Sequence, residues 1–187
     1  MGTGGDGVMA KLGEICTINP KGYSLSEDVE VSFVSMTKVG EHGEFDSSEI
    51  KKYSEAKKGF TSFQDGDVLF AKITPCMENG KGAIAQGLKN GYGFGSTEFH
   101  VLRPHTDQIT AEWLYYLTTW DIFRKNAAKN MTGSAGQKRV PKTFLENYSI
   151  DLPDVKAQNQ QCRKLKKVDF LISLRKPVSY THLTLPT

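Results

Sequence analysis

Residues 131–142 combine small residues with three cations and are therefore well suited to binding an anionic partner. Gly133 and Gly136 can adopt positive φ angles, which lets the backbone approach another surface closely. Basic side chains and short polar groups are common partners of phosphate oxygens. The candidate phosphate contacts in this stretch are Ser134, Gln137, Lys138, Arg139 and Lys142. The alternative is a solvated turn in which Arg139 pairs with a surface carboxylate.

Catalytic chemistry has much weaker support in the sequence. Cys76 and His100 could form a thiol–imidazole pair, but no third orienting group follows at a recognisable spacing. The histidines do not cluster with carboxylates as metal ligands do, and residues 91–96 lack the Gly-Lys-Ser/Thr ending of a phosphate loop. The sequence predicts a binding protein without catalytic residues, metal or cofactor. Two alternatives stay open: a small enzyme that depends on Cys76, and a generic nucleic-acid-binding adaptor.

The net charge of +3 conceals an uneven distribution along the chain. Residues 111–187 hold 13 of the 24 Lys and Arg but 6 of the 21 Asp and Glu, a net charge of +7, which leaves −4 for residues 1–110. A local basic excess favours an anionic partner. Three separated cysteines indicate a reducing cytoplasm rather than a disulfide framework. No apolar run reaches the ~20 residues that span a bilayer, so no membrane contact is expected.

The secondary-structure elements that position these residues are expected to include several short strands in the first part of the chain. At 187 residues the chain has room for one domain with an appendage. Residues 29–34 alternate apolar and polar side chains, and 66–73, 82–85 and 98–102 are further candidate strands. Glycines between them indicate turns: Gly80, Gly87, Gly91, Gly93 and Gly95. The sequence predicts an α+β fold whose main part is a curved, mainly β sheet.

Helical spacing replaces this pattern after Thr110, which can cap a helix start. One helix is expected to continue to about Asn130, before the basic stretch. A helix or turn over 141–148 and an edge strand over 149–153 follow. The apolar side chains of the first helix share one face that is typical of a core contact. They are Trp113, Tyr116, Leu117, Trp120 and Phe123.

A final helix is expected over about 155–176. Its apolar residues are spaced by three, three and four positions, which forms a narrow seam typical of helix pairing. The seam consists of Cys162, Leu165, Val168 and Ile172. The sequence therefore predicts an association helix at the end of the domain.

A series of short motifs resembles the specificity (S) subunit of type I restriction–modification systems over residues 11–176. In chain order the motifs are KLGEI at 11–15, GDVLFAK at 66–72, ENGK at 78–81, GSTEFHVLRP at 95–104, GSAGQKRV at 133–140 and IDLP at 150–153, followed by Gln158. Their order along the chain makes the resemblance fairly specific.

The resemblance implies a target recognition domain that reads half of a bipartite site in double-stranded DNA. Catalysis would lie in separate methyltransferase (M) and restriction (R) subunits. Residues that read bases are expected in loops 36–48, 74–81 and 88–97. Besides the five residues in 131–142, the candidate DNA contacts are Lys72, Thr74, Lys81, Ser96 and Thr97.

The complete subunit of this family has two recognition domains and two helices that pair as an antiparallel coiled coil. This chain has one of each, so it is a half-subunit that forms a homodimer through Leu165, Val168 and Ile172, or a fragment. The expected segments are a flexible leader (1–10), the target recognition domain (11–154), the association helix (155–176) and a tail (177–187). Pro177 stops the helix, and the tail's composition indicates a truncation or an appended, non-native sequence.

Overall fold

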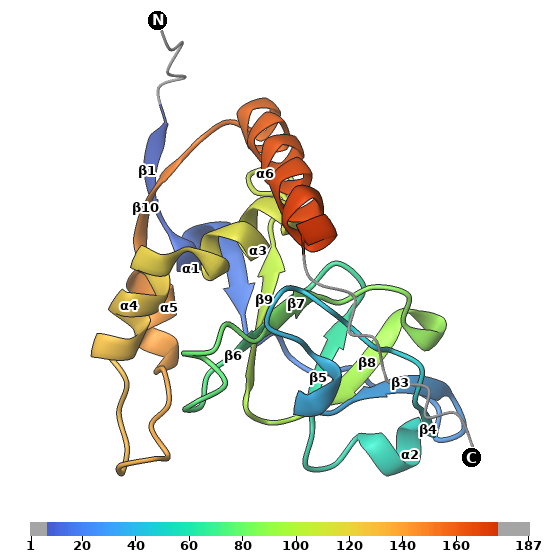
Figure 1. Cartoon of the computed structure of the whole chain (residues 1–187). Coiled ribbons are helices and arrows are strands. Elements are labelled where there is room, and N and C mark those ends of the chain that lie inside the picture. The colour runs from blue at the N-terminus through green and yellow to red at the C-terminus, as the bar shows by residue number, and fades with distance from the viewer. Residues whose placement is uncertain (1–6, 176–187) are drawn as a thin grey trace, which may run out of the picture.

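The computed structural model describes residues 7–175 of the chain. These residues form two four-stranded sheets, a two-stranded ribbon and helices that cover one side of the first sheet (Figure 1). The α+β class predicted from the sequence is confirmed. The expected tail of residues 177–187 and most of the expected leader lie outside the described residues.

The first sheet has the strand order β2-β9-β6-β7, and all neighbours are antiparallel. Its central strand β6 is buried at every position because both of its faces are covered. Val68 and Phe70 belong to one cluster of buried side chains, and Leu69 and Ala71 belong to another. The strands are β2 (Cys16–Ile18), β6 (Val68–Ala71), β7 (Gly82–Ile84) and β9 (Phe99–Pro104).

The second sheet has the order β4-β3-β8-β5, in which β3 and β8 are parallel. The prediction that Gly93 and Gly95 lie in turns is wrong, since both belong to strand β8. A Cβ on Gly95 would lie 2.1 Å from the carbonyl oxygen of Val34, and one on Gly93 would lie 2.2 Å from the ring of Phe63. The missing side chains therefore let β8 fit between its neighbours. The strands are β3 (Glu30–Val34), β4 (Ile50–Lys52), β5 (Thr61–Gln64) and β8 (Tyr92–Gly95).

The main core lies between the first sheet and the helices. Trp113, Leu117 and Phe123 are buried there, as the helical spacing predicts. None of the helices in the described part of the chain combines the length and apolarity needed to cross a membrane. The α-helices are α1 (Leu12–Ile15), α2 (Tyr53–Ala56), α3 (Ala111–Thr119), α4 (Asp121–Lys129), α5 (Lys142–Asn147) and α6 (Val155–Arg175), and two 3-10 turns cover Met36–Lys38 and Lys89–Gly91.

The single helix expected after Thr110 is in fact two. Trp120 adopts an extended conformation, with φ −61° and ψ 136°, and separates α3 from α4. Its N–H still donates to the carbonyl oxygens of Tyr116 and Leu117, each at 3.2 Å. The break turns Trp120 outward, so that it is 40% exposed and does not continue the buried stripe. The apolar spacing alone does not distinguish one helix from two.

The flexible leader expected over residues 1–10 overlaps a strand. Residues Val8–Lys11 form strand β1, which pairs antiparallel with β10 (Ser149–Leu152). The strand predicted before Pro153 therefore exists, but its partner is the start of the described chain rather than either larger sheet. This ribbon brings the beginning of the described chain next to the beginning of α6 (Figure 1).

Candidate nucleic-acid interface

The basic stretch folds as a hairpin, and residues 132–139 are named the basic hairpin below. Thr132 and Arg139 close it, because each N–H donates to the carbonyl oxygen of the other at 3.0 and 2.8 Å. Gly133 and Gly136 have φ angles of +119° and +79°, as the small residues predicted. The tip is exposed and lies at the lower end of Figure 1, whereas α6 lies at the upper end.

The hairpin is held against the end of β6 by backbone and side-chain hydrogen bonds. The backbone N–H and the hydroxyl of Thr74 donate to the carbonyl oxygen of Lys138 at 3.0 and 3.2 Å. The N–H of Val140 donates to the carbonyl oxygen of Lys72 at 2.9 Å. The structure therefore brings Lys72, a candidate DNA contact, next to the hairpin. It also gives the Thr74 hydroxyl a positioning contact within the protein.

Arg139 forms an ion pair rather than standing free. Its Nε donates to Glu98 Oε2 at 2.9 Å and its Nη2 to Oε1 at 2.7 Å, while Nη1 donates to the carbonyl oxygen of Gln137 at 3.1 Å. The hydrogen bonds from Arg139 lower the pKa of the Glu98 carboxyl. This geometry is the surface pairing that the sequence left open as the alternative to phosphate binding. Within the described part of the chain, three of the five guanidinium N–H groups have partners and two do not.

Ser96 and Thr97 lie directly before Glu98 in the turn that leads into β9. The Ser96 hydroxyl accepts a hydrogen bond from the N–H of Glu98 at 3.2 Å, and Thr97 is exposed. Both residues thus neighbour the carboxylate that pairs with Arg139. This places them beside the basic hairpin, in agreement with the sequence-based grouping.

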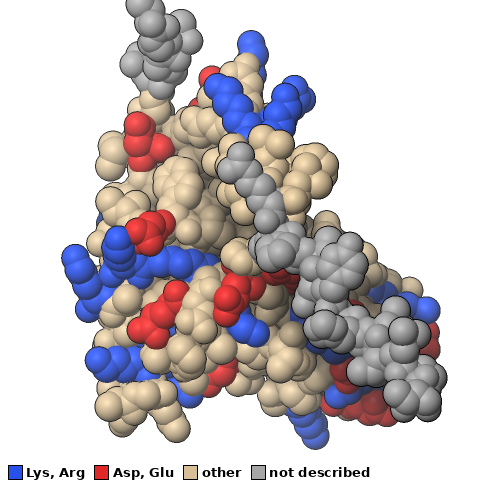
Figure 2. All heavy atoms as spheres, viewed as in Figure 1, with Lys and Arg blue, Asp and Glu red and all other residues tan. Residues whose placement is uncertain are grey.

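The other predicted cations differ in how free they are. Lys81 donates to the carbonyl oxygen of Met36 at 3.1 Å, and Lys142 pairs with Glu146 at 2.9 Å within α5. Among the described residues, neither Lys72 nor Lys138 forms an ion pair. These two lysines are the cations most available to an anionic ligand near the hairpin. Figure 2 shows that basic and acidic groups alternate over the lower left of this face.

A buried arginine that the sequence analysis overlooked supports the neighbouring loop 74–81. Arg124 on α4 donates to the carbonyl oxygen of Met77 and, at 3.0 Å, to that of Gly80. Burial lowers the pKa of its guanidinium to about 10, and its Nε has no partner among the described residues. Its position in a helix of amphipathic pattern gave no signal beyond that of an ordinary surface cation.

His100 connects the hairpin to the first sheet. Its Nε2 donates to the carbonyl oxygen of Val140 at 2.8 Å, and its Nδ1 lies 3.0 Å from the amide nitrogen of Asn19. Because Nε2 donates to a carbonyl oxygen, Nδ1 of the neutral ring carries no proton and accepts a hydrogen bond from the Asn19 amide nitrogen. Burial lowers the pKa of His100 and favours this neutral form. The ring is therefore occupied by structural contacts, and none of its hydrogen bonds reaches Cys76.

Helix α6 belongs partly to the domain and partly to the surface. Gln158 and Cys162 are buried, and the side-chain amide of Gln158 bonds the backbone of Thr110, Gln108 and Pro153. Leu165 packs against the main core, whereas Val168 and Ile172 are more than half exposed. The predicted seam is thus divided between a contact with the domain and an open surface. Its use in a coiled coil stays a prediction.

Comparison with known proteins shows to which family the chain belongs. Residues 6–179 match the family described as Type I restriction modification DNA specificity domain. The chain belongs to this family. It is 42% identical over 175 residues to the Type I restriction enzyme EcoEI specificity subunit of Escherichia coli, a match that covers 92% of this chain and 29% of the relative. It is 46% identical over 152 residues to the EcoAI specificity subunit of the same species, covering 80% and 26%. The chain therefore spans less than a third of these relatives.

Solved structures of type I specificity subunits have the same fold. The HsdS subunit from Thermoanaerobacter tengcongensis superposes with a TM-score of 0.72 at 17% identity, over 91% of this chain and 44% of that chain. The S subunit from M. genitalium gives 0.57 at 12% identity, over 93% and 42%. In both cases this chain matches less than half of the solved chain.

Proposed function

We propose that this chain recognises a sequence in double-stranded DNA as the specificity component of a type I restriction–modification complex. Family membership supports this function, and the basic hairpin supports its location. The observation that carries the proposal is the pairing of the hairpin with the end of β6 through the carbonyl oxygens of Lys72 and Lys138, neither of which forms an ion pair within residues 7–175. Such unpaired cations on an ordered backbone suit phosphate contacts that orient a protein on a duplex.

In this proposal the DNA contacts have two tasks. Lys72, Lys138 and the backbone of the hairpin tip position the phosphates. Exposed polar groups in the adjacent loops, including Thr97 and Gln137, reach the base edges in the major groove. Ser96 and Thr74 orient the loops that carry them. The remaining candidates contribute through the same face after rearrangement of their present contacts: Lys81, Ser134, Arg139 and Lys142.

Separate M and R subunits supply methyl transfer and cleavage in this proposal. The domain of residues 11–154 would face the DNA, and the helix of 155–176 would contact another subunit or a second copy of the chain. As a DNA-binding component it would act in the cytoplasm. These statements extend the functions of the longer relatives to a chain that spans 29% and 26% of their lengths.

Selection from a randomised duplex library tests sequence recognition without knowledge of the target. The full chain is incubated with the library, and bound duplexes are sequenced after several rounds. We expect one short element to be enriched. A combined Lys72→Ala and Lys138→Ala variant should lose most duplex binding, whereas Lys156→Ala, an exposed change on α6, serves as the matched control. Binding without any enriched element would contradict sequence recognition.

Catalysis is tested separately. The chain is incubated with S-adenosylmethionine and the selected duplex, with and without the M subunit encoded beside it. We expect methylation of the DNA with the M subunit present and none with the chain alone. Methyl transfer by the chain alone would overturn the assignment of catalysis to another subunit.

A further inference from the structure

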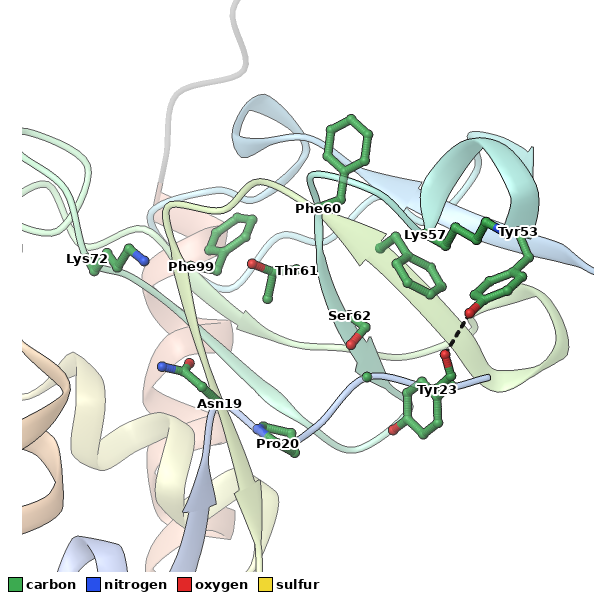
Figure 3. Close-up of a pocket in the computed structure, with 12 residues that line it drawn as sticks. Asn19, Pro20, Tyr23, Tyr53, Lys57, Phe60, Thr61, Ser62, Lys72 and Phe99 are labelled. Atoms are coloured by element: carbon green, nitrogen blue, oxygen red, sulfur yellow. Dashed lines mark hydrogen bonds between the residues drawn. The ribbon is translucent and has the colours of Figure 1, made fainter. Parts of the chain in front are cut away.

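A pocket of about 350 Å³ lies between the two four-stranded sheets (Figure 3). Asn19, Lys72 and Phe99 line it from the side of the first sheet, and Thr61 and Phe94 line it from the second. Strand β5, which carries Thr61, is at the edge of its sheet, so the pocket opens beside a strand with one unpaired side. Its volume falls in the range of about 300–1,000 Å³ that small ligands occupy in proteins.

Five of the twelve residues that line the pocket are aromatic. Phe94 and Phe99 are buried, and Tyr53 is fixed by its hydroxyl, which donates to the carbonyl oxygen of Tyr23 at 2.7 Å (Figure 3). Phe60, in contrast, is 40% exposed at the same pocket. Rigid aromatic walls suit a flat ring, because stacking with aromatic side chains is favourable for every nucleobase.

Some polar side chains of the pocket have hydrogen-bonding or ionic partners among the described residues, and others do not. The amide of Asn19 is bonded to His100 and Val101, and the ammonium of Lys57 is paired with Glu27. Among the described residues, the hydroxyls of Thr61 and Ser62 and the ammonium of Lys72 have no hydrogen-bonding partner. The pocket therefore offers two hydroxyls and one cation that a ligand could satisfy.

Lys72 joins this pocket to the basic hairpin. Its carbonyl oxygen accepts the N–H of Val140 directly after the hairpin, while its side chain lines the pocket. A phosphate bound at Lys72 would thus lie between the hairpin and a space that fits one base. Lys72 therefore belongs both to the pocket and to the face that we assign to DNA.

We propose that this pocket receives one nucleotide of the bound DNA, unstacked from its neighbours. The base enters this partly aromatic pocket and bonds to Thr61 and Ser62, and its phosphate lies at Lys72. The inference rests on the proposed DNA-binding function and adds a contact that an intact, stacked duplex cannot make. An unpaired nucleotide enters at the lowest cost, since its pairing is already lost.

Fluorescence anisotropy with two labelled duplexes tests this proposal on the full chain. One duplex is fully paired, and the other has the same sequence with one additional unpaired thymidine at its centre. We expect the bulged duplex to bind about tenfold more tightly, a gain in the range of base–aromatic stacking. Thr61→Tyr, which fills the pocket, should bring the ratio of the two affinities close to one. Thr61→Val, which removes the hydroxyl, should lower the ratio partially.

Thr106→Val, an exposed change in a turn remote in sequence from the pocket, is the matched control and should keep the ratio. Thermal unfolding verifies that each variant is folded. Equal binding of the two duplexes by the wild type overturns the pocket proposal while leaving duplex binding intact. Failure to bind either duplex overturns the proposed function itself. Thymidine monophosphate is the third probe: if it binds alone as tightly as the bulged duplex, the pocket serves a free nucleotide and the proposal is wrong.

Discussion

The folded structure changes the interpretation of Arg139 as a phosphate ligand. As part of a basic stretch it resembles a phosphate ligand, but the folded chain gives it a bidentate partner in Glu98. Because the pair lies at the surface, with side-chain exposures of 42% for Arg139 and 25% for Glu98, it contributes little stability by itself. Its larger effect is on the electrostatics of the hairpin, where the carboxylate cancels one of the cations that would attract DNA.

Replacing Glu98 by Gln therefore has a predictable direction. The change removes one negative charge and frees the Arg139 guanidinium, so duplex binding should become tighter. The slope of log K against log salt should steepen by about −0.9 if Arg139 gains one phosphate contact. Binding titrations at several salt concentrations measure both effects. Glu112→Gln, which breaks the Lys166 ion pair on α6, is the control. Weaker binding after Glu98→Gln would mean that the pair is needed to hold the hairpin in place.

The burial of His100 predicts how the free energy of unfolding depends on pH. Burial depresses its pKa in the folded chain, whereas the unfolded value is about 6.5. Below about pH 6.5 the unfolded chain gains a proton that the folded chain resists, so the free energy of unfolding falls as the pH falls. The loss can reach about 1.4 kcal/mol per pH unit for one group.

A comparison of chemical denaturation for the wild type and His100→Gln between about pH 7 and 5 isolates this effect. Gln retains a donor for the Val140 carbonyl oxygen but does not titrate in this range. We expect the difference in unfolding free energy between the two proteins to depend on pH, with the wild type losing more on acidification. Parallel curves would show that His100 is not the group responsible.

At the scale of elements, α6 has two different halves. Three of its polar side chains are fixed to α3: the indole N–H of Trp113 donates to Gln161 at 2.9 Å, Lys166 pairs with Glu112 at 3.1 Å, and the hydroxyl of Tyr116 donates to Asp169 at 2.8 Å. Its second half exposes large apolar side chains on several sides of the helix. These are Val168, Phe170, Leu171, Ile172 and Leu174, each more than half exposed. An exposed helix segment with apolar side chains over so wide an arc is typical of a contact with another protein surface.

Substitutions in the two halves of α6 are therefore expected to have different effects. Leu171→Glu combined with Leu174→Glu should reduce association of the chain and leave its unfolding free energy nearly unchanged. Leu165→Glu, which disturbs the core contact, should lower the unfolding free energy by about 1–3 kcal/mol. Sedimentation velocity and chemical denaturation measure the two properties. A wild type that stays monomeric at all concentrations would exclude self-association and leave another subunit as the expected partner.

Local patterns predicted most elements of this fold, and the exceptions have physical reasons. The strands around residues 29–34 and 66–73 and the final helix were predicted because their periodicity reflects which side chains are buried. The break at Trp120 was not predicted, since one extended residue barely alters the spacing of apolar positions. The place of Gly95 in β8 was missed because a glycine that permits close strand packing has the same sequence signal as a turn glycine.

The candidate site was predictable only where its residues are neighbours in sequence. The hairpin follows from a local pattern of glycines and cations. The Arg139–Glu98 pair joins residues separated by 41 positions, and the contact of Arg124 with Met77 spans 47. Such contacts depend on tertiary packing, which no single stretch encodes. The pocket between the two sheets was missed for the same reason, because Asn19, Thr61 and Lys72 belong to three separate segments.

For the whole molecule, the basic excess predicted from the sequence is divided between two ends. Several cations of residues 111–175 are neutralised: Lys125 by Asp121, Lys142 by Glu146 and Lys166 by Glu112. The basic hairpin lies at the lower end of Figure 1, and the cations on α6 gather at the upper end of Figure 2. Total charge therefore overstates the attraction that a duplex would experience at the hairpin.

The salt dependence of DNA binding can show which end of the molecule contacts the DNA. We expect the affinity of the wild type for a duplex to fall between about 50 and 200 mM salt, because bound phosphates release counterions. Lys72→Ala and Lys138→Ala should each reduce the slope of log K against log salt by about 0.9, the value for one lost phosphate contact. Lys164→Ala and Lys167→Ala on α6 are matched changes of one exposed lysine each and should leave the slope unaltered. Equal effects at both ends would show that DNA contacts α6 as well, and an affinity independent of salt would contradict a phosphate-binding hairpin.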